Sequence, residues 1–231
     1  LFAWTYNSDN VSMLPAMINT LFMTVLALLL SVPFGVGAAI YLVEYAKKGN
    51  KLVGIIRVTA ETLSGIPSII YGLFGMLFFV TALKWGYSMM AGAATLAIMV
   101  LPVIMRTTEE ALLCVPDSFR EGSFGLGAGK LRTIFKIVLP SAIPGILSGI
   151  ILAIGRIVGE TAALIYTSGT VANLAGFFDS GRTLAIHMYS LSREGMHTNE
   201  AYATAVVLLI VVLIINGVSS LIAKKFEAPK Q

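Results

Sequence analysis

The sequence predicts an all-α membrane protein, a polytopic bundle of transmembrane helices, and two observations carry this prediction. Hydrophobic residues make up 57% of the 231 residues and charged residues only 12%, whereas a soluble globular chain carries about 25% charged residues. Long charge-free stretches also recur along the chain. So few charges cannot cover a soluble globule, which excludes a soluble enzyme, a secreted disulfide scaffold and a disordered chain. We expect residues 1–231 to form one transmembrane domain.

Five charge-free intervals are each long enough to cross a membrane. A helix needs about 18–20 apolar residues to span a hydrocarbon core of about 30 Å. The fourth interval continues past Arg156 and Glu160 into a further apolar run. We therefore predict five spanning helices within the intervals Asn10–Val43, Thr62–Leu83, Trp85–Met105, Ile137–Gly155 and Ala201–Ala223.

The second interval contains a break around Gly65 and Pro67. Proline removes a backbone hydrogen bond and glycine loosens the same turn. Two interpretations remain open. The freed carbonyls, with Ser64 and Ser68, can line a watery path, or the small residues can simply let helices approach closely.

The basic residues predict the orientation of the chain. With five spans the two termini face opposite sides of the membrane. If the C-terminus is cytoplasmic, 12 of the 16 Lys and Arg residues lie on the cytoplasmic side, three lie outside and Arg156 lies within the membrane. Short cytoplasmic loops carry such an excess. The sequence therefore predicts a multi-pass protein of the cytoplasmic membrane with a cytoplasmic C-terminus, and the basic residues do not indicate nucleic-acid binding.

The longest polar stretch, Arg106–Lys136, lies between the third and fourth spans. It predicts a short helix, a glycine turn, a second helix and then Pro140 at the entry to the next span. The run Gly125–Lys130 is similar to a phosphate-binding loop, but a P-loop needs G-x4-G-K-[ST] after a strand, and Leu131 stands where the hydroxyl is required. We therefore expect a helical cytoplasmic loop over residues 106–140 and no ATP hydrolysis on this chain.

A charged pair, Arg156 and Glu160, lies inside the fourth span. A charge at the centre of a span costs roughly 2.5–3.5 kcal/mol on insertion scales. The two residues are i and i+4 and can pair on a helix, while Gly155 and Gly159 can bring a neighbouring helix close. The Arg156 guanidinium offers donors suited to a tetrahedral oxyanion. A permanent salt bridge that fixes helix packing is an equal alternative.

The predicted external loop, residues 169–199, carries four further candidates. His187 and His197 have no third ligand nearby, so we expect solvated or interfacial side chains and no metal site. Arg182 and Arg193 can meet an incoming anion or a delivery protein, although exposed loop charges are common.

The cytoplasmic loop carries a motif with a family resemblance. A glutamate and two small residues are followed by a glycine and, after nine intervening residues, by Ile-x-Leu-Pro. This resembles the EAA loop of bacterial ABC importer permeases, which inserts into a cleft of a separate ATPase subunit. The resemblance implies that coupling role for Glu121, Gly122, Ser123, Gly127, Ile137, Leu139 and Pro140.

Other segments resemble the phosphate-specific branch of these permeases, PstA type. They are Glu61–Gly75, Arg106–Glu110, Val115–Glu121, Leu139–Gly145 and Gly155–Thr161. The resemblance implies a type I ABC importer permease fold and a transport role for Arg156 and Glu160. We expect the anion path to be lined by Arg156, Glu160, Thr161, Ser64, Pro67 and Ser68.

The resemblance also implies a function and partners. The function is translocation of inorganic phosphate by an ATP-driven importer. The partners are a second permease subunit, an ATPase dimer that holds ATP and magnesium, an external phosphate-binding protein and membrane lipid; no cofactor is expected on this chain. The family usually has six helices, so we expect a first helix to be missing here.

Alternatives fall in three groups. The chain can serve another oxyanion, such as sulfate or molybdate, or be the sister phosphate permease subunit. An intramembrane enzyme would need a paired Asp, an HExxH helix or a Ser/His pair within the spans, and none occurs in the sequence. A membrane scaffold would need neither the Arg156–Glu160 pair nor the coupling loop.

Overall fold

The computed structural model describes residues 3–6, 11–47, 49–195 and 197–226; Asn10, where the first predicted interval begins, lies outside these ranges. The described chain is helical throughout and has no strand, as predicted. Its elements, with η for a π-helical turn, are α1 (Leu14–Ile40), η1 (Tyr41–Tyr45), α2 (Lys51–Ser64), α3 (Ser68–Gly75), η2 (Met76–Ala82), α4 (Met89–Leu113), α5 (Asp117–Gly125), α6 (Lys130–Thr133), η3 (Ile134–Val138), α7 (Leu139–Val158), α8 (Ala162–Ile165), α9 (Leu184–Glu194) and α10 (Thr198–Phe226).

Four segments of the described chain are long and apolar enough to cross a membrane. They are Leu14–Tyr45, Met89–Leu113, Lys130–Val158 and Thr198–Lys225. A fifth candidate is the pair Lys51–Ser64 and Ser68–Ala82, whose axes bend by 100° at the break between them. Four of the five predicted spans are therefore continuous helices, and the second is a bent pair.

The bend lies at the predicted break. The residue before a proline is pushed out of the helical region, and Pro67 has no N–H to continue the ladder of α2. The Tyr71 hydroxyl of α3 donates to the carbonyl of Leu63 at 2.7 Å, back across the bend. The carbonyl freed by the break therefore meets protein, which is the condition under which a membrane helix tolerates one.

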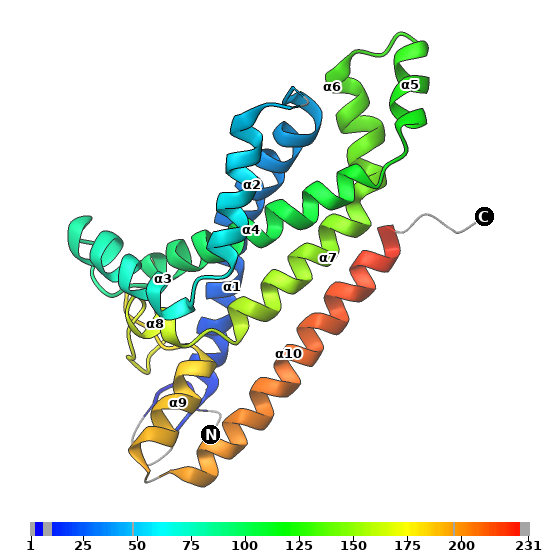
Figure 1. Cartoon of the computed structure of the whole chain (residues 1–231). Coiled ribbons are helices and arrows are strands. Elements are labelled where there is room, and N and C mark those ends of the chain that lie inside the picture. The colour runs from blue at the N-terminus through cyan, green and yellow to red at the C-terminus, as the bar shows by residue number, and fades with distance from the viewer. Residues whose placement is uncertain (1–2, 7–10, 48, 196, 227–231) are drawn as a thin grey trace.

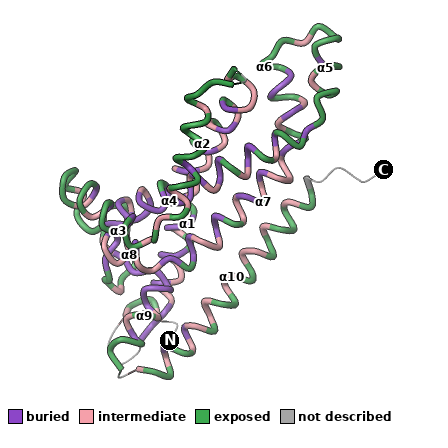
Figure 2. The backbone as a smooth tube through the Cα atoms, viewed as in Figure 1, coloured by how far each residue is buried: buried purple, intermediate pink, exposed green. Residues whose placement is uncertain are grey.

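The centre of the bundle is α4, which packs mainly against α1 and α7. Figure 2 shows buried residues concentrated where these helices cross, while α10 is mostly exposed or half-buried. Small residues permit the contacts of α4 with α7: a Cβ on Gly149 would lie 1.9 Å from Thr107 Oγ1, and one on Gly145 would lie 2.6 Å from Ala111 Cβ. Close helix approach is thus one role that the glycines do have.

The molecule has two distinct ends (Figure 1). At one end, called the loop end here, lie α5, α6 and the C-terminal end of α10. At the other, the α9 end, lie α9 and the first described residues. The polar loop and the last described turn of α10 thus lie toward the same end, and the side of the membrane that this end faces stays a prediction.

Pro140 lies in the first turn of α7, as predicted for the entry to this span, but the chain is already helical before it. Residues Lys130–Val158 form one continuous helix, with the π-helical turn η3 directly before Pro140. Proline in a helix lacks one N–H and its ring clashes with the carbonyl four residues back. The wider turn of η3 changes the pairing at that position, so the helix continues through the proline.

Candidate functional site

The coupling-loop residues lie on α5 and on the helix that follows it. α5 begins directly after Pro116, and Gly127, with φ of +80°, turns the chain back toward α6. Such a positive φ favours glycine. Across the hairpin, Ser123 and Thr133 share a hydrogen bond of 2.8 Å between their hydroxyls. The two halves of the predicted motif are therefore brought together, because α5 packs against η3.

The outer face of this hairpin is free of protein contacts on the side of the motif. Glu121 is exposed, and a Cβ on Gly122 would meet nothing within 4 Å. The side chain of Leu126 is 91% exposed, and Phe119 and Phe124 are each about half exposed. An apolar tip beside a small residue is a surface on which another protein can dock closely.

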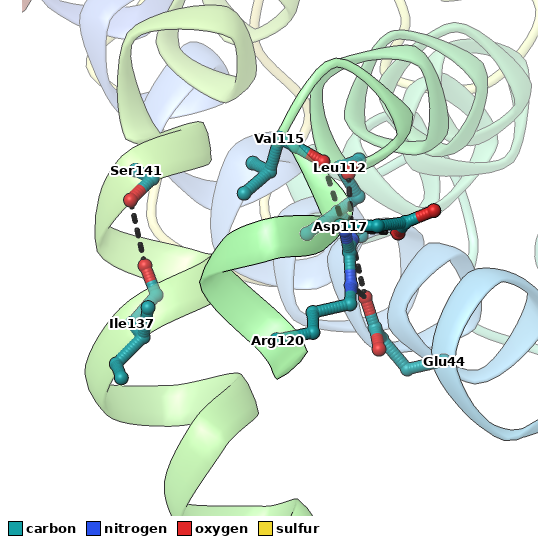
Figure 3. Close-up of polar contacts among 7 residues, drawn as sticks. All are labelled: Glu44, Leu112, Val115, Asp117, Arg120, Ile137 and Ser141. Atoms are coloured by element: carbon teal, nitrogen blue, oxygen red, sulfur yellow. Dashed lines mark hydrogen bonds and ion pairs between the residues drawn. The ribbon is translucent and has the colours of Figure 1, made fainter. Parts of the chain in front are cut away.

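Arg120 fixes the hairpin to the rest of the molecule (Figure 3). Its Nη2 and Nε donate to Glu44 Oε1 at 2.8 and 3.1 Å. The same guanidinium donates to the carbonyls of Leu112 and Val115, at 2.9 and 2.8 Å, where α4 ends. The fifth bond, of 3.1 Å, goes to Asp117 Oδ1. One largely buried side chain, 15% exposed, thus joins α5 to the end of α4 and, through Glu44, to η1, which follows α1 directly.

The Glu44–Arg120 pair was not anticipated from the sequence. The two residues are 76 positions apart, so no helical spacing relates them. The only signal was Glu44 itself, a lone acid at the end of a long apolar run. Its side chain is 8% exposed in the structure, and a buried acid requires a cation.

Arg156 lines a groove between α4, α7 and α10. The groove has a volume of about 570 Å³, and its wall consists of Val103, Ser148, Ile151, Leu152, Gly155, Arg156 and Asn216. Within the described chain the Arg156 guanidinium has neither a hydrogen-bond partner nor an ion-pair partner. Its charge lies within electrostatic range of the Tyr71 hydroxyl, beside the α2–α3 bend. The groove therefore holds an unpaired cation that can receive an anion.

The expected pairing of Arg156 with Glu160 is wrong. α7 ends at Val158, and Gly159 is its C-cap, so Glu160 lies beyond the helix on which i,i+4 spacing holds. The Glu160 side chain turns the other way and accepts from the backbone N of Ala163 at 3.1 Å, at the start of α8. Glu160 is buried, and its carboxylate caps a helix instead of neutralising Arg156.

The expected close helix contact at Gly155 and Gly159 is also wrong. A Cβ on Gly155 would meet nothing within 4 Å, and one on Gly159 would meet only the carbonyl of Gly155. Gly155 instead lines the groove beside Arg156. The small residue leaves space for an ion there, because a side chain in its place would narrow the groove.

The remaining predicted path residues lie apart from the groove wall. Ser64 donates to the carbonyl of Glu61 at 2.7 Å, within α2. Pro67 and Ser68 form the start of α3 at the bend. The Thr161 hydroxyl donates to the carbonyl of Gly159 at 3.5 Å. Their roles in an anion path remain predictions.

Asn216 and the Arg57–Glu109 ion pair are two polar features missed in the sequence. Asn216 of α10 lines the Arg156 groove, and its Oδ1 is buried without a partner. A lone amide inside a long apolar run was the signal for it. Arg57 of α2 pairs with the buried Glu109 of α4. Glu109 therefore joins α2 to α4.

The prediction for His187 is wrong, because this side chain is fully buried. Burial, with the nearby charge of Arg182 as a smaller cause, lowers the pKa of His187 from 6.5 to about 3. His197 remains partly exposed, with its Nδ1 3.8 Å from Glu200. In the described part of the chain no group of three or more His, Cys, Asp or Glu residues is placed to hold a metal.

A bundle of membrane-spanning helices with an exposed hairpin at one end and an unpaired cation in a groove between spans fits the class of membrane permeases. A family model described as binding-protein-dependent transport system inner membrane component matches residues 31–228. The chain belongs to this family. The prediction of a transporter permease subunit is thereby confirmed.

Relatives and solved structures agree with the family. The probable ABC transporter permease protein YqgI of Bacillus subtilis is 37% identical over 91% of this chain and 78% of its own length. The phosphate transport system permease protein PstA 1 of Mycobacterium tuberculosis is 37% identical over 90% of this chain and 69% of its own length. PstA of Yersinia pestis is 37% identical over 86% and 68%.

The fold resembles solved ABC importers. An inward-facing structure of the MetNI methionine ABC transporter has a TM-score of 0.72 at 20% identity and covers 93% of this chain and 94% of that one. A bacterial ABC transporter for alginate import has a TM-score of 0.72 at 16% identity, over 93% and 79%. At these identities the likeness shows the fold alone, and it confirms the predicted type of permease.

Proposed function

We propose that this chain is the membrane-spanning permease subunit of an ATP-driven importer that carries inorganic phosphate across the cytoplasmic membrane. The observation that carries the proposal is the unpaired Arg156 in its groove, in a chain 37% identical to phosphate transport permeases. A planar guanidinium binds a tetrahedral oxyanion through two parallel hydrogen bonds. Ser148 and Asn216 bring further polar groups to the same wall.

The hairpin of α5 and α6 is the proposed docking element for an ATPase on another chain. The exposed tip at Leu126 and the open face at Gly122 support this assignment. ATP and magnesium belong to that partner, and Glu121, Gly122, Ser123, Gly127, Ile137, Leu139 and Pro140 form or support the contact. The basic side chains near the loop end support a cytoplasmic location for it and for the C-terminus.

The remaining proposed partners complete the importer. A second permease subunit packs beside this one, and an external phosphate-binding protein delivers the ion at the α9 end. The ion then passes along the groove of Arg156 and the α2–α3 bend, with Glu160 and Thr161 at the end of α7 and Ser64, Pro67 and Ser68 at the bend. Motion of the hairpin reaches α1 and α4 through Glu44–Arg120.

The test is ATP-dependent uptake of labelled phosphate by proteoliposomes that hold the complete complex. Arg156→Ala removes the unpaired cation, and we expect a loss of about tenfold or more, since a charge-assisted hydrogen bond contributes roughly 1.5–3 kcal/mol. Lys225→Ala, at an exposed basic residue in the last turn of α10 that has no assigned role, is the matched control. Sulfate uptake in place of phosphate would overturn the substrate, and unchanged uptake by Arg156→Ala would make Arg156 a packing residue.

The docking role has a separate test at Gly127. A β-branched residue at φ of +80° is strained by about 1–2 kcal/mol, although no neighbour lies within 4 Å of its Cβ. We expect Gly127→Val to misdirect the turn and abolish ATPase activity stimulated by the loaded binding protein. Gly129→Ala is the matched control, because φ of −73° suits any residue. Full stimulation in Gly127→Val would favour a scaffold role.

A further inference from the structure

The α9 end contains a concentration of polar atoms that have no partner. In the described chain, eight buried side-chain N and O atoms lack a hydrogen bond. Five of them belong to three residues, namely Nε and Nη2 of Arg182, Oγ1 of Thr183, and both ring nitrogens of His187. Buried polar groups are almost always paired, so such a cluster indicates a missing ligand.

The backbone around these residues is firmly held. The N of Leu184 donates to Thr20 Oγ1 at 2.8 Å, and Asn19 Nδ2 donates to the carbonyl of Arg182 at 3.2 Å. The N of Arg182 donates to the carbonyl of Val171 at 2.9 Å. The segment is thus anchored to α1 and to the loop that precedes the segment. The unpaired side chains therefore do not result from a poorly anchored backbone.

Within this cluster, the buried group that most needs a partner is the positive charge of Arg182. Its side chain is buried, with 5% of the residue exposed, and it belongs to none of the ion pairs of the described residues. The ring of Tyr6 lies over the guanidinium, 4.4 Å from Cζ to centroid. A cation–π contact offsets part of the burial cost, but it provides no acceptor for Nε or Nη2.

The groups around Arg182 indicate which class of ligand the cluster can bind. His187 stands edge-on to Tyr6 with 6.1 Å between ring centroids, and its low pKa leaves it neutral, with one N–H to donate. Thr183 is the N-cap of α9 but its hydroxyl caps nothing, so the positive end of that helix faces the cluster as well. Water would satisfy the hydroxyl and the imidazole but would leave the guanidinium unneutralised, and a metal cation would be repelled.

We propose that Arg182, Thr183 and His187 form an outer binding site for a tetrahedral oxyanion, closed by the ring of Tyr6. The ion accepts from the guanidinium, the hydroxyl and the imidazole N–H, and Tyr6 must swing aside to admit it. The site lies at the α9 end, outside the groove of Arg156. The choice of inorganic phosphate as its ligand rests on the proposed function, whereas the existence of the site does not.

The experiment measures equilibrium binding of labelled inorganic phosphate to the assembled complex in maltoside micelles, without nucleotide or external binding protein. An Arg156→Ala background removes the groove site. We expect saturable binding to remain in that background and its affinity to fall about tenfold or more when Arg182→Gln is added. Loss of transport by Arg156→Ala thus tests the proposed function, and the change on Arg182→Gln tests the outer site.

A second measurement covers the case in which Arg182→Gln fails to assemble. Tyr6→Ala uncovers the guanidinium, so an arginine-specific reagent should modify Arg182, as read by mass spectrometry. Phosphate should protect it, while Tyr6→Phe, which keeps the ring, should stay unreactive. Modification that phosphate does not slow would overturn the proposal.

Two further measurements distinguish a lipid headgroup from a free ion and test whether the chain itself supplies a partner for Arg182. A phospholipid retained by the native complex but lost in Arg182→Gln would support the site with a lipid headgroup as its ligand. Asp9 lies outside the described residues, and its carboxylate is the alternative partner. If Asp9→Asn and Arg182→Gln lower the melting temperature equally, and the double variant melts no lower, the chain neutralises Arg182 itself and the proposal is wrong.

Discussion

Arg120, which is largely buried, and Arg182, which is buried, lie at opposite ends of the molecule and differ in what surrounds them. Arg120 makes five hydrogen bonds, two of them to the buried carboxylate of Glu44. Arg182 faces the ring of Tyr6 and leaves Nε and Nη2 unpaired. A cation whose donors are all used is a structural joint, whereas a cation with open donors is available to a ligand. Arg156, unpaired in its groove, belongs with Arg182.

The largest expected effect is at the structural joint. Arg120→Ala leaves Glu44 as a buried charge without its partner, which costs about 3–5 kcal/mol of stability. It also frees the carbonyls that end α4, so we expect the complex to hydrolyse ATP without import. The measurements are thermal unfolding of the complex and the ratio of phosphate imported to ATP consumed. A variant as stable and as tightly coupled as the native complex would show that Arg120 is not a joint.

The second prediction is an increase in stability when Arg182 is replaced. Arg182→Met replaces an unpaired buried cation with an apolar side chain of similar length, which we expect to stabilise the phosphate-free complex by about 2 kcal/mol. In the Arg156→Ala background, which lacks the groove site, added phosphate should raise the melting temperature when Arg182 is present but not when it is replaced by Met, because only the chain with Arg182 then binds the ion. Destabilisation in phosphate-free buffer would mean that Arg182 has a protein partner.

The third prediction concerns pH at the α9 end. His187 has a folded-state pKa of about 3 and an unfolded value near 6.5, so between these values the unfolded chain binds the extra proton. Stability should be fully present above pH 6.5 and fall by about 1.4 kcal/mol per unit as the pH drops toward 3. The facing groups are Arg182 and Tyr6. His187→Gln should flatten this slope in thermal unfolding, and His197→Gln should retain it.

The smallest effect on stability and coupling is expected for Asp117, the exposed partner of Arg120. Asp117 also pairs with Arg120, at 3.1 Å, but its side chain is 79% exposed. An exposed partner contributes at most about 1 kcal/mol. Asp117→Asn should therefore change the melting temperature and the coupling ratio little compared with Arg120→Ala. An equal loss from both variants would assign the joint to the exposed pair instead of to Glu44.

The sequence predicted what depends on local chemistry. The spans follow from apolar length, the bend from Pro67, and the turn of the hairpin from Gly127, because each is decided within a few residues. The Arg156–Glu160 pairing failed at a helix end, although Gly159 was a visible signal for one. Spacing of four implies contact only while the helix continues.

Features that depend on tertiary contacts could not be predicted from the sequence. Glu44 meets Arg120 only after α1, α4 and α5 have packed. His187 is buried because Tyr6, from the far end of the sequence, lies against it. Asn216 lines the same groove as Arg156 because α10 packs beside α7. Each of these contacts joins segments that no periodic pattern relates.

The unbroken helix from Lys130 to Val158 has a mechanical consequence. It touches α4 most closely at Gly145 and Gly149, which makes that crossing a natural fulcrum. With a rise of 1.5 Å per residue, the arm from Gly149 to Lys130 is about 28 Å and the arm from Gly149 to Arg156 about 10 Å. The rod is therefore a reducing lever: a displacement of the hairpin arrives at Arg156 about three times smaller and with about three times the force.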